Sequence, residues 1–169
     1  MIRDASPVTL PDAPEGYYMR AYKKGDEEDW CKCCINGELG VTEISVSQFE
    51  RIMLADKRVD TRNIYFLFHE SGIVAGTVTY QFGMQPMEGY IHMVGITPEH
   101  RGKGLALYMN LFVVDIMIKA GVKSILLTTD DWRLPAIRTY MKCGFVPCIT
   151  DSAMEKRWDE VRQKLCLKR

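Results

Sequence analysis

The sequence predicts an α/β fold in which helices flank a central sheet. Runs rich in β-branched and aromatic residues alternate with runs whose apolar residues recur every three or four positions, as in strands and amphipathic helices. The chain has 169 residues, of which 47% are hydrophobic, and this matches one domain with one core. We expect residues 1–16 to be an N-terminal extension and residues 17–169 to form this single domain.

The first half of the domain is expected to contain a strand, two helices and a β-hairpin. These elements are predicted at residues 17–22, 26–35, 45–53, 63–69 and 73–82. The first helix opens on acidic residues, which complement its positive end, and the second begins with Ser45 as a cap and carries an apolar stripe. The turn Glu70-Ser71-Gly72 joins the two β-rich runs and indicates a hairpin.

The second half is expected to contain three further strands and three helices. They are a buried strand at 90–96, a helix that carries Leu107 to Ile118, a strand at 124–129, a helix that ends at Gly144, a further strand after Gly144 and a terminal helix at 152–167. Pro135 suits the first turn of the fourth helix of the chain, and Gly144 suits the left-handed position just past its end.

The charge balance argues against two classes of partner. With 22 basic and 22 acidic residues the net charge is zero, so overall charge favours neither nucleic acid nor an anionic membrane. The sequence has no apolar run of the length that a signal peptide or a membrane span needs. We therefore expect a cytoplasmic protein that binds neither nucleic acid nor membrane.

The six cysteines are expected to be free thiols, because the cytosol is reducing. They are Cys31, Cys33, Cys34, Cys143, Cys148 and Cys166. The Cys31-Lys32-Cys33-Cys34 run has no second paired cluster and no histidines at ligand spacing, so we predict small core residues and no metal site. A role as nucleophile stays open for Cys143 or Cys148, although no sequence feature marks either thiol as having a depressed pKa.

The segment Arg101-Gly102-Lys103-Gly104-Leu105-Ala106 combines two glycines and two cations at the boundary between a strand and a helix. At a helix N-terminus the first backbone N–H groups lack partners and the dipole is positive, and glycine lets a ligand approach the backbone, so the segment is typical of a phosphate-binding turn. The glycine spacing excludes a P-loop, and Leu107 replaces the third glycine of a dinucleotide-binding fingerprint.

A third phosphate-binding pattern fits this segment, and a second signature follows it further along the chain. The two consist of Arg101, Gly104 and Ala106, and of Ala136, Tyr140, Gly144 and Phe145. In type and in order they resemble the signatures of the GNAT superfamily of N-acetyltransferases, over roughly residues 17–150. The resemblance implies the GNAT fold, a mixed, largely antiparallel twisted sheet of six to seven strands with about four flanking helices, here with an extra C-terminal helix.

The resemblance also implies an activity, the transfer of an acetyl group from acetyl-CoA to a primary amine of a small molecule or amino-acid-like metabolite. The amine would attack directly, without an acyl-enzyme. Acetyl-CoA would be the cosubstrate, no metal would be needed, and the protein would be a monomer or homodimer. The implied donor-binding residues are Val94, Gly95, Ile96, Arg101, Gly102, Lys103, Gly104, Leu105, Ala106, Arg133 and Tyr140.

Two residues are predicted to carry the chemistry. Tyr140 occupies the position at which family members often have a tyrosine whose hydroxyl meets the CoA sulfur. His92 is the best candidate for the base, because an unperturbed pKa of about 6.5 leaves it largely neutral near pH 7. The strand period of two places His92 on the same face as Val94 and Ile96.

Each assignment has an alternative. Tyr140 and His92 can instead be packed, hydrogen-bonded core residues. Arg133 stands where many family members have Asn, and it is either a ligand of a phosphate or carboxylate or a solvated residue at a helix start. Four aromatic residues either line the acceptor pocket or fill the core, namely Trp30, Phe49, Tyr65 and Tyr80. The alternative function is a noncatalytic acyl-CoA-binding sensor module.

Overall fold

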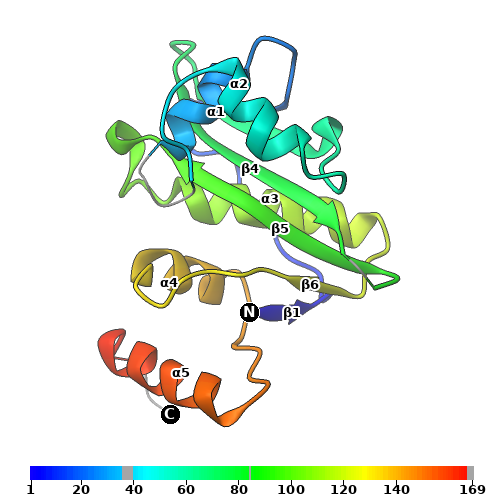
Figure 1. The fold of residues 1–169 in the computed structure, drawn as a ribbon, viewed down its shortest axis with the longest axis vertical. Coiled ribbons are helices and arrows are strands. Elements are labelled where there is room, and N and C mark those ends of the chain that lie inside the picture. The colour runs from blue at the N-terminus through cyan, green and yellow to red at the C-terminus, as the bar shows by residue number, and fades with distance from the viewer. Residues whose placement is uncertain (36–39, 84, 167–169) are drawn as a thin grey trace.

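A single six-stranded sheet organises the protein in the computed structural model, which describes residues 1–35, 40–83 and 85–166. The strands are β1 (Ile2–Asp4), β2 (Tyr17–Ala21), β3 (Ile64–His69), β4 (Val74–Phe82), β5 (Glu88–Ile96) and β6 (Ser124–Leu126). Their order across the sheet is β1-β6-β5-β4-β3-β2, and only β5 and β6 run parallel (Figure 1). The predicted mixed, largely antiparallel sheet is therefore confirmed.

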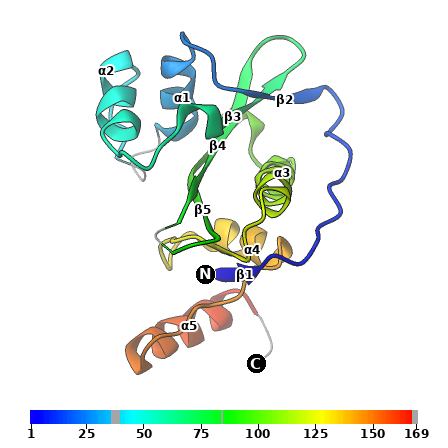
Figure 2. The same ribbon diagram turned by 90° about the vertical axis from the view of Figure 1, so that its right-hand side faces the viewer.

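Helices cover both faces of this sheet. They are α1 (Glu27–Cys34), α2 (Val46–Phe49), α3 (Leu105–Lys119), α4 (Leu134–Lys142) and α5 (Ser152–Lys164), with a π-helical turn at Glu50–Leu54 and short 3₁₀ turns at Thr61–Asn63 and Pro98–His100. In the edge-on view α1 and α2 lie on one side of the sheet and α3 on the other (Figure 2). None of the described helices is long and apolar enough to cross a membrane.

Helix ends follow the local signals in the sequence. The Ser45 side chain accepts a hydrogen bond from the backbone N–H of Gln48 at 3.2 Å, and so caps α2. Gly144, just past α4, has a φ of +86°, which is a left-handed conformation that favours glycine. The predicted helix from Ser45 is nonetheless split, because it continues as the π-helical turn after Phe49.

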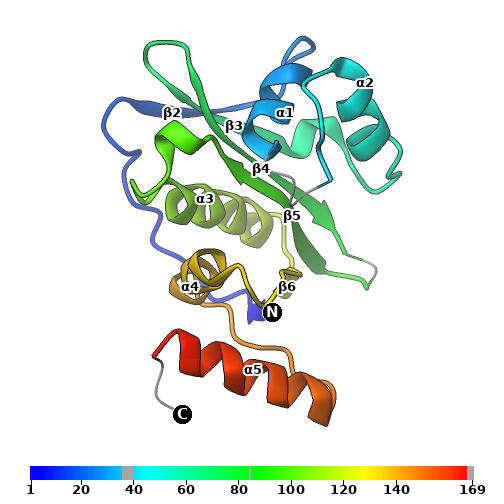
Figure 3. The same cartoon turned by 60° about the vertical axis from the view of Figure 1, so that its left-hand side comes forward.

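Two cores fill the layers on either side of the sheet. Between the sheet and α3, Met109, Val113 and Met117 are fully buried against strand residues. Between the sheet and α1 with α2, Trp30 and Phe49 are fully buried, with ring centroids 5.4 Å apart. A third, smaller cluster joins α5 to α4, so the C-terminal helix lies beyond α4 and away from the sheet (Figure 3).

The chain's N-terminus forms the edge of the sheet where a C-terminal strand was predicted. β1 pairs with β6, and Ile2 exchanges two backbone hydrogen bonds with Val146, at 2.9 and 2.8 Å. This pairing is an isolated bridge and does not extend into a ladder. Residues 145–150, all of which the structure describes, form no strand, and that prediction is wrong. The domain boundary at residue 16 stays a prediction, although part of the predicted extension lies in the sheet.

Candidate functional site

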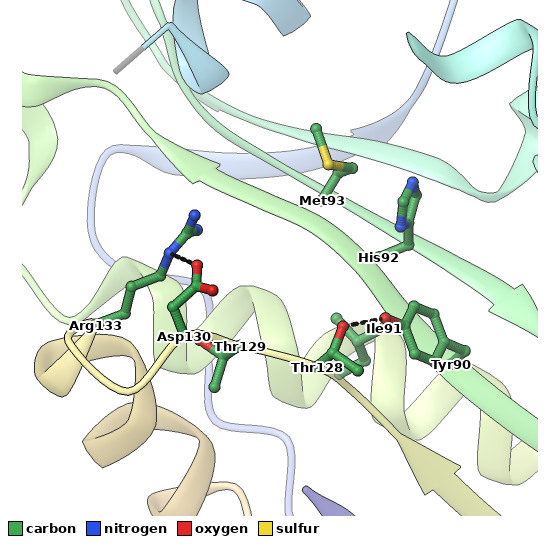
Figure 4. Close-up of a pocket in the computed structure, with 8 residues that line it drawn as sticks. All are labelled: Tyr90, Ile91, His92, Met93, Thr128, Thr129, Asp130 and Arg133. Carbon is green, nitrogen blue, oxygen red and sulfur yellow. Dashed lines mark hydrogen bonds and ion pairs between the residues drawn. The ribbon is translucent and has the colours of Figure 1, made fainter. Parts of the chain in front are cut away.

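A cavity opens where two neighbouring strands separate. β5 pairs with β6 only through Glu88, Gly89 and Tyr90, whereas Leu127 pairs its backbone with Met1 and so stays with β1. The cavity between β5 and the chain after β6 has a volume of about 290 Å³ (Figure 4). It is lined by Tyr90, Ile91, His92, Met93, Thr128, Thr129, Asp130 and Arg133. The predicted strand at 124–129 was too long, because β6 ends at Leu126 and Thr128 and Thr129 line this opening.

A β-bulge in β5 determines which side chains face the cavity. The register with β4 shifts between Thr77 and Thr79, and Met93 has a φ of +52°, which is rare for a residue with a side chain. Met93 packs with the core under α1 and α2, whereas Val94 and Ile96 pack with the core under α3. The prediction that His92 shares a face with Val94 and Ile96 is wrong, because the bulge reverses the alternation beyond His92.

Beyond the bulge, one edge of β5 has no strand beside it in the described residues. The N–H of Thr97 donates to Ala75 on the β4 side at 2.9 Å, so alternation directs the backbone groups of Val94 and Ile96 to the open edge. The Ile96 carbonyl is indeed free of β4 and accepts a hydrogen bond from Arg101 Nε at 3.2 Å.

Gly95 lets α1 approach this part of β5 closely. A Cβ atom built on Gly95 would lie 2.5 Å from the backbone oxygen of Cys33 and 3.1 Å from the Sγ of Cys34. Because a backbone atom of a packed helix cannot move aside cheaply, any larger residue would push α1 off the sheet. The packing of α1 on β5 therefore requires a glycine at position 95, beside the open edge of β5.

The loop between β5 and α3 presents a row of unpaired donors. Gly102 and Gly104 have φ values of +77° and +76°, and no atom lies within 4 Å of a Cβ built on either. In the part of the chain that the structure describes, nothing accepts a hydrogen bond from the backbone N–H groups of residues 102–106. With the N-terminus of the fifteen-residue α3 behind it and two exposed cations within it, this loop has the properties of an anion site.

Tyr140 lies in α4, close to the cavity. Its side chain is 9% exposed, and burial raises the pKa of its hydroxyl to about 12. Arg133 and Tyr90, which both line the cavity, are close enough to act on that pKa. None of the described residues forms a hydrogen bond with the Tyr140 hydroxyl, which does not fit the alternative of a hydrogen-bonded core tyrosine.

The Arg133 side chain lines the cavity and is not a solvated residue at a helix start. Its side chain is only 16% exposed, its Nε lies 3.0 Å from Asp130 Oδ2, and its guanidinium carbon lies 4.9 Å from the centre of the Trp132 ring. Figure 4 shows Arg133 and Asp130 on the loop that faces β5 across the cavity. A largely buried guanidinium at this position can bind an anionic group.

His92 is half-buried and lies on the α1 and α2 side of β5 (Figure 4). Burial lowers its pKa below the usual value, the Asp56 carboxylate opposes this shift, and Arg58 adds to it. Asp56 and Arg58 form an ion pair with a shortest distance of 2.7 Å. His92 is therefore an uncharged imidazole near pH 7 beside a cavity, although no hydrogen bond joins it to another described side chain.

The family of the chain follows from a direct match. Residues 20–145 match the model of the acetyltransferase (GNAT) family, and this segment covers most of the chain. The chain belongs to the GNAT family. In this GNAT domain the first of the two predicted signatures lies at the start of α3, and the second begins in α4 and continues just past its end.

Relatives in sequence and in structure agree with this assignment. Mycothiol acetyltransferase of Pseudarthrobacter chlorophenolicus is 27% identical over 161 residues, which are 89% of this chain and 46% of the relative. The chain spans about half the length of the curated relatives it matches. A GCN5-related N-acetyltransferase from Sphaerobacter thermophilus has a TM-score of 0.66 at 24% identity, over 85% of this chain and 45% of that one. Diaminobutyrate acetyltransferase of Paenibacillus lautus, solved with its substrate and coenzyme A, has a TM-score of 0.59 at 16% identity, over 75% and 74%. At these identities the solved structures show the fold alone.

Several residues stand outside the site of this GNAT domain. The four aromatic residues for which an acceptor pocket was one alternative all pack in the cores, namely Trp30, Phe49, Tyr65 and Tyr80. Burial raises the pKa of Cys143 to about 12, which disfavours the thiolate form that a nucleophilic cysteine needs. The three cysteines of α1 are buried small core residues, as predicted, and the described residues contain no cluster of His, Cys, Asp and Glu that could hold a metal ion.

Sequence reasoning missed several residues around the cavity. Tyr90 donates to or accepts from Thr128 at 2.6 Å, and these two side chains bridge β5 to the segment after β6. Asp56 and Arg58 reach His92 from the turn after the π-helical segment. No local pattern marks Asp56 or Arg58, because their proximity to His92 depends on how α2 packs on the sheet.

Proposed function

We propose that this chain transfers an acetyl group from acetyl-CoA to a primary amine of a small, polar molecule. One observation carries the proposal, namely that the anion site before α3, the open edge of β5 and the cavity beside Tyr140 adjoin one another. The hydrogen bond between Arg101 and Ile96 ties the first two together. A long donor with a phosphate group at one end and a reactive group at the other matches such an arrangement.

The residues present fit acetyl-CoA. The five free N–H groups of residues 102–106 would hold the pyrophosphate, and Arg101 and Lys103 would add charge-assisted hydrogen bonds. The backbone of Val94 and Ile96 at the open edge would hold the amide-bearing arm, as an added strand does. Bound in this way, acetyl-CoA supplies an acetyl thioester at the cavity.

Two side chains would move the protons of the transfer. An alkylammonium has no lone pair, so the acceptor must first give a proton to a base, and His92 is uncharged and able to take it directly or through a water molecule. The amine nitrogen would then form a bond to the acetyl carbon while the bond from that carbon to sulfur breaks. The second proton that the nitrogen loses would pass through water and restore the Tyr140 hydroxyl after that hydroxyl has protonated the sulfur. Tyr140, whose raised pKa keeps its hydroxyl protonated, would donate a proton to the leaving sulfur.

Replacing His92 with glutamine should remove the acidic limb of the pH–rate profile. In the natural protein kcat/KM should fall as the pH drops through the pKa of His92, which lies below about 6.5, because only the uncharged imidazole accepts a proton. In His92→Gln the value should be lower, on the order of 100-fold, and flat across that range. His69→Gln, which replaces a histidine outside the cavity, should keep the limb. A limb that persists in His92→Gln removes His92 from the mechanism.

The acceptor that we propose is a small polar amine. Six of the eight residues that line the cavity are polar or charged. The curated relatives are named mycothiol acetyltransferases, and one solved neighbour contains L-2,4-diaminobutyric acid. Diamino acids, and amines related to mycothiol with any thiol blocked, therefore come first in a screen for the acceptor.

The test is a screen of acetyl-CoA consumption over such amines, read as released free thiol. Turnover with any amine above the background hydrolysis of the thioester supports the proposal. Binding of coenzyme A without turnover over the whole set would contradict it, and would favour the noncatalytic sensor module. A rise in the melting temperature on adding coenzyme A measures the binding independently.

A further inference from the structure

A cluster of aromatic and cationic side chains lies beside the loop before α3 and outside the cavity. Tyr17 begins β2 and pairs with His69 at the end of β3, while His100 and Lys103 come from the chain after β5. The Tyr17 ring lies between two imidazoles, with its centroid 5.1 Å from that of His69 and 5.6 Å from that of His100, both edge-on. The Lys103 Nζ lies 6.0 Å from the centre of the same ring.

Two hydrogen bonds join three members of this cluster in a chain. Lys103 Nζ donates to the Tyr17 hydroxyl oxygen at 3.2 Å, and that hydroxyl lies 2.8 Å from His100 Nδ1. An ammonium can only donate, and a phenol has one hydrogen. The Tyr17 hydroxyl oxygen therefore accepts from Lys103, and its one hydrogen is left to bond His100 Nδ1 when that nitrogen carries no proton.

A hydrogen bond from the Tyr17 hydroxyl to His100 requires an uncharged His100 whose Nδ1 carries no proton. The surroundings of His100 favour that form. Burial lowers its pKa, the nearby charges of Lys103 and His69 lower it further, and Glu99 opposes them. Among the described residues no hydrogen bond joins His69 to Tyr17; the two rings meet edge-on, and His69 Nδ1 is engaged by Ser71.

We propose that Tyr17 and His100 are positioning residues that aim the Lys103 ammonium at the anion held by the loop. The inference rests on the proposed function, in which residues 102–106 bind the pyrophosphate of acetyl-CoA. A lysine has a long, flexible side chain, and ordering it on binding costs free energy that a prior hydrogen bond removes. The hydrogen-bond chain and the contact with the ring restrict Lys103 before the donor arrives.

The experiment is a double-mutant cycle on the affinity for coenzyme A, measured by titration calorimetry at pH 7.5. Lys103→Met should raise the Kd about 3- to 10-fold, and Tyr17→Phe, which keeps the ring, should raise it about 2- to 5-fold. The double variant should bind as Lys103→Met does, because Tyr17 acts through Lys103. His100→Phe should match Tyr17→Phe and supplies a second route if that variant folds poorly.

Other outcomes overturn the inference in distinguishable ways. A Tyr17→Phe loss of equal size in the natural protein and in the Lys103→Met background assigns Tyr17 a structural role only. An unchanged Kd in both Tyr17→Phe and His100→Phe also overturns it, and leaves the proposed function intact. If Lys103→Met and a bulky replacement of Gly104 both leave the Kd unchanged, the loop does not bind the donor, and the proposed function fails with it.

Discussion

Replacing Tyr140 with phenylalanine should lower kcat on the order of 100-fold while the Kd for coenzyme A stays nearly unchanged. The hydroxyl is the group that we assign to protonation of the leaving sulfur, and its pKa near 12 keeps it protonated over the working range. Stability should not fall, because no described residue forms a hydrogen bond with this hydroxyl. Steady-state kinetics on the acceptor found in the screen, with a thermal melt of each variant, measures both quantities.

Tyr108→Phe is the matched control for this variant. Tyr108 is as buried as Tyr140, at 8% exposed, but it belongs to α3, and the cavity residues Arg133 and Tyr90, which act on the pKa of Tyr140, are not among the groups that act on its pKa. Replacing Tyr108 should leave kcat within a few fold of the natural value. This control separates the effect of losing a buried tyrosine hydroxyl from the effect of losing the proton donor to the sulfur. If Tyr140→Phe keeps its kcat and melts at a lower temperature, Tyr140 is a structural residue.

Replacing Gly104 with valine should weaken coenzyme A binding on the order of 100-fold or more. A β-branched residue is strained at a φ of +76°, at a cost of about 1–3 kcal/mol. Its side chain would also occupy the open space over the free N–H groups, where the pyrophosphate is proposed to bind. Calorimetric titration with coenzyme A measures the loss of affinity, and a thermal melt measures the strain.

Gly121→Val separates these two effects. Gly121 follows α3 at its other end, has a φ of +90° and has no atom within 4 Å of a built Cβ, so it suffers comparable strain far from the loop. The two variants should melt at similarly lowered temperatures, but only Gly104→Val should lose affinity for coenzyme A. Equal affinities in both variants would remove the loop from donor binding.

The parts of the site that the sequence predicted are those with a local cause. A left-handed φ at Gly144, a capping hydroxyl at Ser45 and a row of free N–H groups at the start of α3 each depend on a few consecutive residues. The order of strands and helices has the same origin, since apolar spacing is a local property. The loop and the GNAT resemblance could therefore be recognised from the amino-acid sequence alone.

The parts that the sequence did not predict depend on pairing between distant segments. The bulge at Met93 is a mismatch of register between β4 and β5, and a period-two count along β5 alone cannot detect it. The separation of β5 from β6 depends on Leu127 pairing with Met1. The expected last strand also depended on distant pairing, because Val146 meets Ile2 of β1 in an isolated bridge and not in a strand.

By itself, then, the sequence determined the class of fold and the glycine-containing turn before α3, because caps, turns and periodicity act over a few residues. Only the tertiary structure decided how the site is assembled. It placed His92 on the opposite face from Val94, put Asp56 beside His92, and joined Lys103 to Tyr17 across 86 positions of chain. Each of these contacts exists because sheet register and helix packing bring distant residues together, and no local pattern encodes that proximity.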